Sequence, residues 1–146
     1  IDMNKIIFSS TAGQNADKKL KKYRKEQISK MSETEKKLKE EETKIISQKN
    51  ILSKEEYAEK IKILRQKAND YRINRKNILD ELTKKRFSLT KNMIDKIQPI
   101  IADYSTSKNI SLVIQKKNLV LGKTELDITD EILILVNKKI TKITLN

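Results

Sequence analysis

The fold of this chain is decided by residues 57–89, YAEKIKILRQKANDYRINRKNILDELTKKRFSL. Apolar side chains recur there at alternating intervals of three and four residues, and nearly every position between them is polar or charged. The stripe is formed by Tyr57, Ile61, Leu64, Ala68, Tyr71, Ile78, Leu82 and Leu89, with gaps at Arg75 and Lys85. So narrow a stripe is typical of a coiled-coil seam against one partner helix, with the other faces in water. We therefore predict that about half of the chain is a helical arm.

The partner helix is expected immediately before this stretch, at residues 14–50. Its stripe is thinner and consists of Leu20, Tyr23, Ile28, Met31, Leu38 and Ile45. Residues 48–53 interrupt the pattern, and Ser53 is followed three positions later by Glu56, which is the spacing of a capping box. Leu52 and Tyr57 have the spacing of a hydrophobic staple across the same helix start. These signals predict an antiparallel hairpin whose tip lies near residues 48–53.

The second helix is predicted to run to about residue 104 and to outrun its partner. Within residues 91–104 the apolar stripe widens to include Met93, Ile94, Ile97, Ile100, Ile101 and Tyr104. A wider stripe is typical of a helix that faces a core, so this part is expected to pack into a body. Pro99 lies inside it and removes one helical hydrogen bond, which predicts a kink or a break near Gln98.

The rest of the body is predicted at the two ends of the chain. Residues 1–3 are interpreted as the end of a strand and residues 4–10 as a short helix, with a weak point at residues 9–13. After residue 109 the period changes: residues 110–114 and 119–121 are rich in β-formers and flank a turn, which predicts a β-hairpin. Asp127 and Thr129 are candidate caps of a final short helix. A two-stranded hairpin is marginal alone, and a second subunit often closes such edges.

Composition supports an arm and a small body. The chain has 146 residues, of which 36% are charged and 36% hydrophobic, with two Gly, one Pro and no Trp. That is too little apolar mass for a core enclosing the whole chain, and oligomerisation would supply missing burial. The predicted fold class is α+β, mostly α, with a long antiparallel coiled-coil helical hairpin projecting from a small β body. Residues 1–15 and 105–146 are assigned to the body and residues 16–104 to the arm.

The net charge and the absence of certain residue types limit the classes of function that this chain can have. The net charge of +13 is spread along the helices, so acidic proteins, lipid headgroups or nucleic acid are natural partners, although a purely solubilising surface is an equal alternative. The chain has no His and no Cys, and its two glycines are too far apart for a phosphate loop. Asp127, Asp130 and Glu131 are interpreted as caps of a helix rather than as metal ligands. We expect no enzyme activity, no cofactor and no small-molecule substrate.

Two local stretches resemble a known family. One is NISLVIQKKNLVL at residues 109–121, followed by LDITDEIL at residues 126–133, and the other is Ile1-Asp2-Met3 leading directly into a helix. Together with the order of the elements, they resemble the Skp/OmpH family of periplasmic chaperones over the whole chain. Pro99 and the tail, residues 138–146, depart from the family pattern.

The resemblance implies a homotrimer in which strands of three subunits form a β-barrel and three helical hairpins hang from it. The trimer would act as an ATP-independent holdase that keeps unfolded outer-membrane proteins between its arms. It would work in the periplasm, after removal of a signal peptide that precedes Ile1. An anionic lipid or membrane surface is a further candidate partner. The residues assigned to the trimer body are Ile110, Leu112, Ile114, Leu119, Leu121 and Ile128.

Client binding is expected to be diffuse. The candidate residues are Lys36, Lys37, Lys44, Lys49, Ile51, Leu52, Lys60, Arg65 and Arg72. Tyr23, Tyr57 and Tyr71 are interpreted as seam residues rather than client contacts. The alternative function is a basic coiled-coil scaffold or a nucleic-acid-binding protein, which is disfavoured because stacking aromatics are few and no DNA-reading motif is present.

Overall fold

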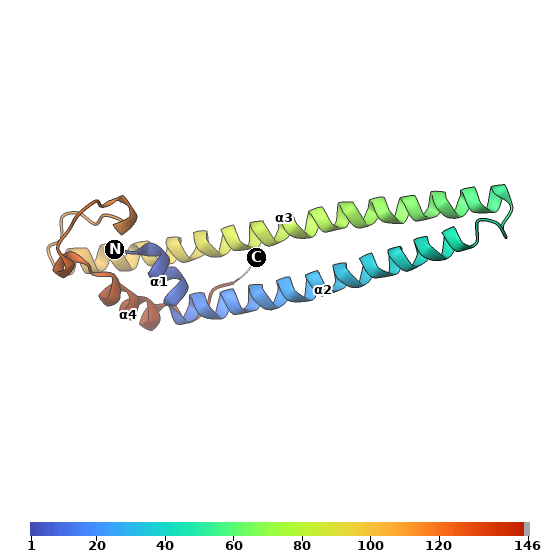
Figure 1. The fold of residues 1–146 in the computed structure, drawn as a ribbon. Coiled ribbons are helices and arrows are strands. Elements are labelled where there is room, and N and C mark those ends of the chain that lie inside the picture. Colours follow the sequence, from blue (N-terminus) through green and yellow to red (C-terminus); the bar gives the residue numbers. More distant parts are fainter. Residues whose placement is uncertain (145–146) are drawn as a thin grey trace. The chain divides into compact units, whose positions relative to one another are not determined.

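The computed structural model describes residues 1–144, and most of them are helical (Figure 1). The elements in chain order are α1 (Met3–Ser9), α2 (Thr11–Ser47), α3 (Lys54–Ser107), the 3-10 turns η1 (Lys116–Asn118) and η2 (Thr124–Leu126), and α4 (Thr129–Lys139). The chain folds into two compact units. The hairpin unit is Lys22–Thr83, and the core unit is Ile1–Lys21 together with Lys84–Asn146.

The hairpin unit is held by the seam that the sequence predicts. On α3, Leu64 is buried and the other seam residues from Tyr57 to Leu82 are half-buried, whereas Arg75 in the gap is exposed. On α2, Met31 and Ile45 are buried at heptad spacing. The assignment of Ile28 to this stripe is wrong, because its side chain is 45% exposed. Gln27, four residues before Met31, continues the heptad line and takes the half-buried position instead.

The tip of the hairpin confirms the predicted capping box. Residues 48–53 form the turn and α3 begins at Lys54. The Glu56 backbone N–H donates to Ser53 Oγ at 3.2 Å, and the Ser53 backbone N–H donates to Glu56 Oε2 at 3.0 Å. These reciprocal bonds satisfy two amides that a helix start would leave without partners. Hydrogen bonds from Ser53 also lower the pKa of Glu56 from its usual value.

The core unit buries apolar faces of all four helices around one cluster. The buried residues are Ile6 and Ile7 of α1, Ala12 and Ala16 of α2, Leu89, Met93, Ile97 and Ile100 of α3, and Ile132 and Val136 of α4, with Ile140 beyond it. Intervals of three and four residues along α3 put its four contributors on one side of the helix. The apolar stretch near the end of α3 therefore faces a core, and α1 packs against α4 (Figure 1).

The junction between α1 and α2 is unusually tight. Ser10 separates the two helices, which confirms the weak point predicted at residues 9–13. Its buried hydroxyl donates to the Ile7 carbonyl at 3.0 Å and accepts from the Gly13 N–H at 3.2 Å, so one side chain caps both helix ends. A Cβ on Gly13 would lie 1.7 Å from the Ile7 carbonyl oxygen. This position therefore requires glycine because the two backbones approach so closely.

The predicted β-hairpin is not present, and residues 1–144 contain no strand. Residues 116–118 do form the predicted turn, but the segments on either side run without pairing to each other. Instead, the Ile1 amino group donates to the Ile114 carbonyl at 2.8 Å, and the Lys116 N–H donates to the Ile1 carbonyl at 2.7 Å. An extended segment becomes a strand only beside a partner, and one terminal residue is too short a partner to make a ladder.

Of the two outcomes predicted near Gln98, the helix break is wrong, because α3 continues through Pro99 to Ser107, and the kink stays a prediction. Pro99 is exposed, so the carbonyl that loses its donor can be hydrated, while Ile97 and Ile100 on either side are buried and hold the helix. The helix ends in a Schellman motif. Asn109 has φ 52°, the Ile110 N–H donates to Ser105 O at 2.9 Å, and the Asn109 N–H donates to Thr106 O at 3.3 Å.

The final helix begins at Thr129, and Ile128 is its N-cap residue. Asp127, one position before the N-cap, accepts a hydrogen bond from the Thr129 N–H, so it satisfies an amide of the helix start.

The tail after α4 runs antiparallel to α3. Lys139 Nζ lies 3.0 Å from Asp103 Oδ2, and Asn92 Nδ2 donates to the Thr144 carbonyl at 3.4 Å. Between these contacts the tail adds one buried and one half-buried isoleucine to the core. The tail is thus packed up to residue 144, and residues 145–146 lie outside the described part.

Candidate functional site

The core unit carries an exposed apolar segment at residues 112–126. Its exposed members are Leu112, Ile114, Leu119, Val120, Leu121 and Leu126, with exposed fractions from 45% to 103%. A groove of about 480 Å³ lies among this segment, Ile1, Ile110 and Ile128. Of the six residues assigned to the trimer body, Ile110 and Ile128 are half-buried in the single chain and the other four are exposed. An apolar surface of this density is typical of a protein interface.

A polar network fixes the amino end against this segment. The Asp2 N–H donates to Thr129 Oγ1 at 2.9 Å, and the Thr129 hydroxyl in turn donates to Asp127 Oδ1. Lys116 Nζ donates to the other oxygen of Asp127 at 2.8 Å. These hydrogen bonds, from Lys116 first and from Thr129 second, hold the pKa of Asp127 well below its usual range, and Asp127 raises the pKa of Lys116.

This network predicts acid sensitivity. Because the folded-state pKa of Asp127 lies below the ordinary value of 3.8, its contribution to stability is complete well above that value. It is lost progressively as the pH falls from that value toward the lower folded-state pKa. Between pH 5 and pH 3, the free energy of unfolding in urea should fall more for the native chain than for Asp127→Asn. Glu125→Gln, which removes an exposed carboxylate 3.5 Å from Lys123, is the control. Parallel pH profiles for the native chain and Asp127→Asn would contradict this role.

The hairpin unit is crossed by three polar contacts that report its register. Tyr23 Oη donates to Glu81 at 3.0 Å, and Tyr71 Oη donates to Glu35 at 3.0 Å. Lys67 Nζ donates to both carboxylate oxygens of Glu41, at 2.7 and 2.9 Å. Tyr23 and Tyr71 are half-buried, which confirms their interpretation as seam residues. In an antiparallel helix pair, the numbers of two facing residues add to a nearly constant value. The three pairs give similar values, between 104 and 108, so they agree on one register.

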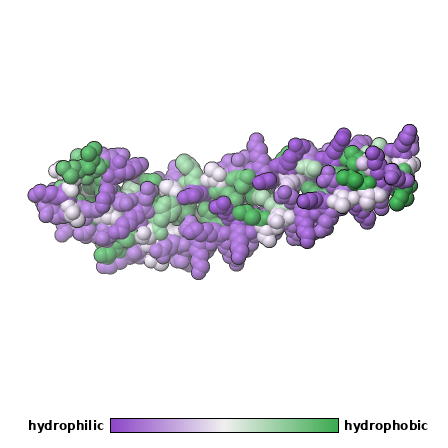
Figure 2. Space-filling view, in the orientation of Figure 1, coloured by the Kyte–Doolittle hydropathy of each residue, from purple (hydrophilic) through white to green (hydrophobic). Residues whose placement is uncertain are grey.

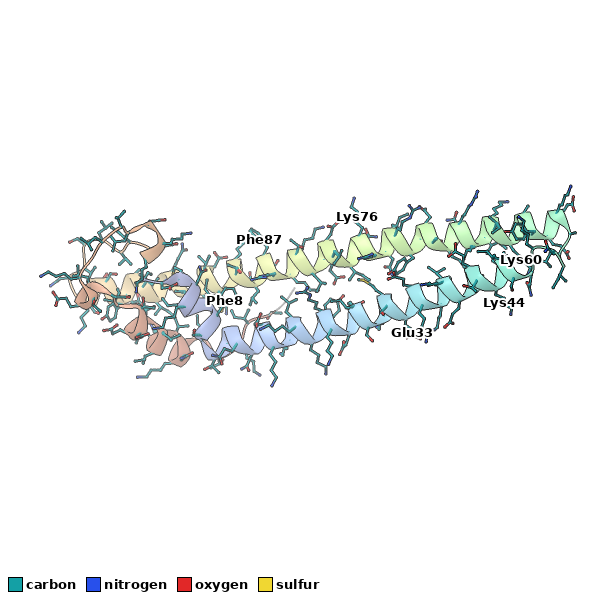
Figure 3. All side chains as sticks on the ribbon, viewed as in Figure 1. Phe8, Glu33, Lys44, Lys60, Lys76 and Phe87 are labelled. Carbon is teal, nitrogen blue, oxygen red and sulfur yellow. The ribbon has the colours of Figure 1, made fainter. Side chains whose placement is uncertain are left out.

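The structure separates the residues predicted to bind clients. All are exposed except Leu52, which is half-buried, and Ile51 at the tip is 82% exposed. Lys37 and Lys44 lie four residues before and three residues after Glu41, so they share the edge of the hairpin where Glu41 meets Lys67. Lys60, seven residues before Lys67, is on that edge too. Figure 3 shows Lys44 and Lys60 at the same end of the hairpin unit.

Arg65 and Arg72 do not join them. Arg72 follows Tyr71 directly and lies with Arg65, seven residues before it, on the opposite edge, where Glu35 accepts from Tyr71. Lys36 points away from the seam, and Lys49 belongs to the turn. Lys30 and Lys67 also lie on the edge with Lys37, Lys44 and Lys60, but they were not among the residues predicted from the sequence. The intervals of seven residues along each helix could have indicated this edge.

Exposed apolar side chains are also found on the hairpin unit. Those that are at least 44% exposed are Ile28, Ile46, Ile51, Ile63, Ile73 and Leu79. The residue numbers of Ile28 and Leu79 add to a value within the range of the three cross-hairpin pairs, so these two side chains lie at nearly the same level of the hairpin. Figure 2 shows hydrophobic patches among the hydrophilic residues of one face of this unit. The hairpin therefore offers both cationic and shallow apolar contacts.

Within residues 1–144, none of the helices has the length and apolar character that crossing a bilayer requires. The same residues contain no group of three or more Asp or Glu side chains arranged to hold a metal ion.

Comparison with known proteins identifies the family. A family model described as outer membrane protein (OmpH-like) matches residues 1–135. A crystal structure described as that of an OmpH-like outer membrane chaperone from Caulobacter crescentus has the same fold, with a TM-score of 0.89 and 16% identity over 98% of this chain and 85% of that one. The comparison with curated proteins gave no match. With the family model covering the helical hairpin and nearly all of the core unit, this chain belongs to the OmpH-like family of outer membrane proteins.

Proposed function

We propose that this protein is an ATP-independent holdase of the periplasm that binds unfolded outer-membrane proteins and prevents their aggregation. The observation that carries the proposal is the hairpin unit. It presents exposed lysines and scattered exposed isoleucines along its two helices. Such a surface suits many weak contacts with chains of different sequence, and membership of the OmpH-like family supports the same function.

The proposed working form is a homotrimer. The exposed apolar segment at residues 112–126 and the groove beside it would be covered by two further copies, and the extended backbone there would find ladder partners in them. Three hairpin units would then surround one shared space. Because each chain carries a net charge of +13, that space would attract acidic stretches of a client.

The test is suppression of aggregation when a urea-unfolded β-barrel outer-membrane protein is diluted into buffer without nucleotide. The native chain should suppress it, and a variant lacking residues 31–44 and 62–75 should lose most of the effect. This deletion removes two heptads from each helix, so the seam, the turn and the capping box stay in phase. Circular dichroism and the oligomer mass verify that the shortened chain folds and assembles.

Two results would contradict the proposal. Full protection by the shortened variant would show that the hairpin is not the working part. Tight binding to duplex DNA with a steep dependence on salt, without suppression of aggregation by the native chain, would favour the nucleic-acid-binding alternative.

A further inference from the structure

The two edges of the hairpin unit differ in charge. One edge, which we call the lysine edge, carries Lys30, Lys37 and Lys44 of α2 and Lys60 and Lys67 of α3. The assignment starts from the contact of Lys67 with Glu41 and extends along each helix by heptad steps, which keep side chains on the same edge. At ~1.5 Å of rise per residue, neighbouring lysines on one helix are ~10 Å apart along the edge.

The opposite edge is balanced. Heptad steps from Glu35, which accepts from Tyr71, lead along α2 to Ile28 and Glu42, and the facing positions of α3 are Arg65, Arg72 and Leu79. Its two carboxylates and two guanidinium groups cancel, and its remaining members are apolar. The lysine edge also includes Glu41, which pairs with Lys67, and Glu81, two heptads after Lys67. Its five lysines outnumber these two carboxylates, so the positive charge of the hairpin unit is distributed unevenly between its edges.

The lysine edge also keeps free cations. Within residues 1–144, Lys37 is paired with Glu33 at 2.7 Å and Lys67 with Glu41 at 2.7 Å, whereas Lys30, Lys44 and Lys60 make no ion pair with a carboxylate. All five lysines are exposed. Lys30, Lys44 and Lys60 can thus accept anionic groups without breaking an ion pair, although Lys60 also lies in the field of Glu56. The intervals along the edge are ones that an extended polypeptide can match.

We propose that the lysine edge, and not the opposite edge, binds acidic stretches of unfolded polypeptide. This inference rests on the proposed holdase function and assigns its electrostatic part to one surface. A polypeptide is favoured over a nucleic acid because the edge leads toward the exposed Ile51 at the tip, which suits an apolar side chain. A base would instead need an aromatic platform, and Tyr23 is engaged with Glu81.

The test compares two triple variants of the full chain that lose the same charge. Lys30→Gln, Lys44→Gln and Lys60→Gln together neutralise the unpaired lysines of the lysine edge. Arg65→Gln, Arg72→Gln and Lys76→Gln neutralise three exposed cations of the other side of α3. The probe is a labelled polyglutamate of twenty residues at low salt, with a neutral Gly-Ser peptide of equal length as control.

We expect the lysine-edge variant to bind polyglutamate roughly tenfold more weakly, from three lost surface charge contacts of modest strength each. The matched variant should stay within about twofold of the native chain. Equal weakening of both variants would overturn the inference, since it would show that only the overall field matters. A larger loss in the matched variant would overturn it as well.

The outcomes separate this inference from the proposed function. If the native chain suppresses aggregation but does not bind polyglutamate, the assignment of the lysine edge fails and the holdase function stands. If it binds polyglutamate through the lysine edge but does not suppress aggregation, the holdase function fails and the edge remains an anionic-polypeptide site. Preference of the lysine edge for duplex DNA over polyglutamate at equal salt would overturn the choice of partner.

Discussion

Replacement of Gly13 by alanine should destabilise the core unit, although the same change inside a helix normally stabilises it. Alanine exceeds glycine in helix propensity by about 1 kcal/mol. At Gly13, however, the new Cβ would lie 1.7 Å from the Ile7 carbonyl oxygen, where no flexible side chain can move aside. Separation of α1 from α2 would disturb a packed cluster at a cost of roughly 3 kcal/mol, at the upper end for overpacked cores. We therefore expect a net loss of about 2 kcal/mol.

The sign of this change is its most informative property. Thermal unfolding followed by circular dichroism at fixed protein concentration should show a midpoint lower by about 5 °C. Gly122→Ala is the matched control, because its Cβ would meet only the end of the exposed Leu119 side chain, at 2.7 Å. That variant should unfold within a degree or two of the native chain. A Gly13→Ala protein as stable as the native one would show that α1 does not dock as described.

Leu112→Asp should convert a trimer into monomers. The proposed interface uses the exposed apolar segment at residues 112–126, and a carboxylate buried there without a partner would cost several kcal/mol in each subunit. Light scattering at micromolar concentration should give about 51 kDa for the native chain, which is three chains of 17.0 kDa, and about 17 kDa for the variant.

The matched control for this prediction is Phe87→Asp. Phe87 is 71% exposed and Leu112 is 72% exposed, so both changes place a charge on an equally accessible site, but Phe87 lies on α3 away from the segment. The particle mass of the Phe87→Asp variant in light scattering should equal that of the native protein. A native chain that scatters as a single 17.0 kDa particle would end the trimer proposal, whatever the variants do.

Local features were predictable from the sequence because their causes are local. The seam follows from side-chain spacing, and the helix start at Lys54 follows from Ser53 and Glu56, which contact each other. Ile28 was misplaced because the stripe of α2 is thin, and the choice between Gln27 and Ile28 depends on heptads further along the helix. The heptad intervals of the lysines were visible in the sequence. That the lysines of the two helices share one edge became clear only from the contact between Lys67 and Glu41.

Features that depend on distant partners were not predictable in this way. Residues 110–121 have the composition of strands, but a strand also needs a neighbour. Within residues 1–144, the backbone of residues 111–121 bonds outside its own range only to the backbone of Ile1. The close approach of Gly13 to Ile7 is set by how α1 docks, which no spacing rule contains. Pro99 was expected to kink or break α3, but no break occurs, because buried isoleucines on both sides outweigh one missing hydrogen bond.

The tyrosines that bridge the hairpin have an optical consequence. The chain has no Trp and only four Tyr, so its near-ultraviolet absorbance and intrinsic fluorescence come almost entirely from tyrosine. Three of the four, Tyr23, Tyr57 and Tyr71, belong to the hairpin unit. The hydrogen bond to Glu81 raises the pKa of Tyr23, and burial followed by the bond to Glu35 raises that of Tyr71. The protein thus carries a built-in chromophore set that reports chiefly on the hairpin, and separation of its helices can be followed spectroscopically without a label.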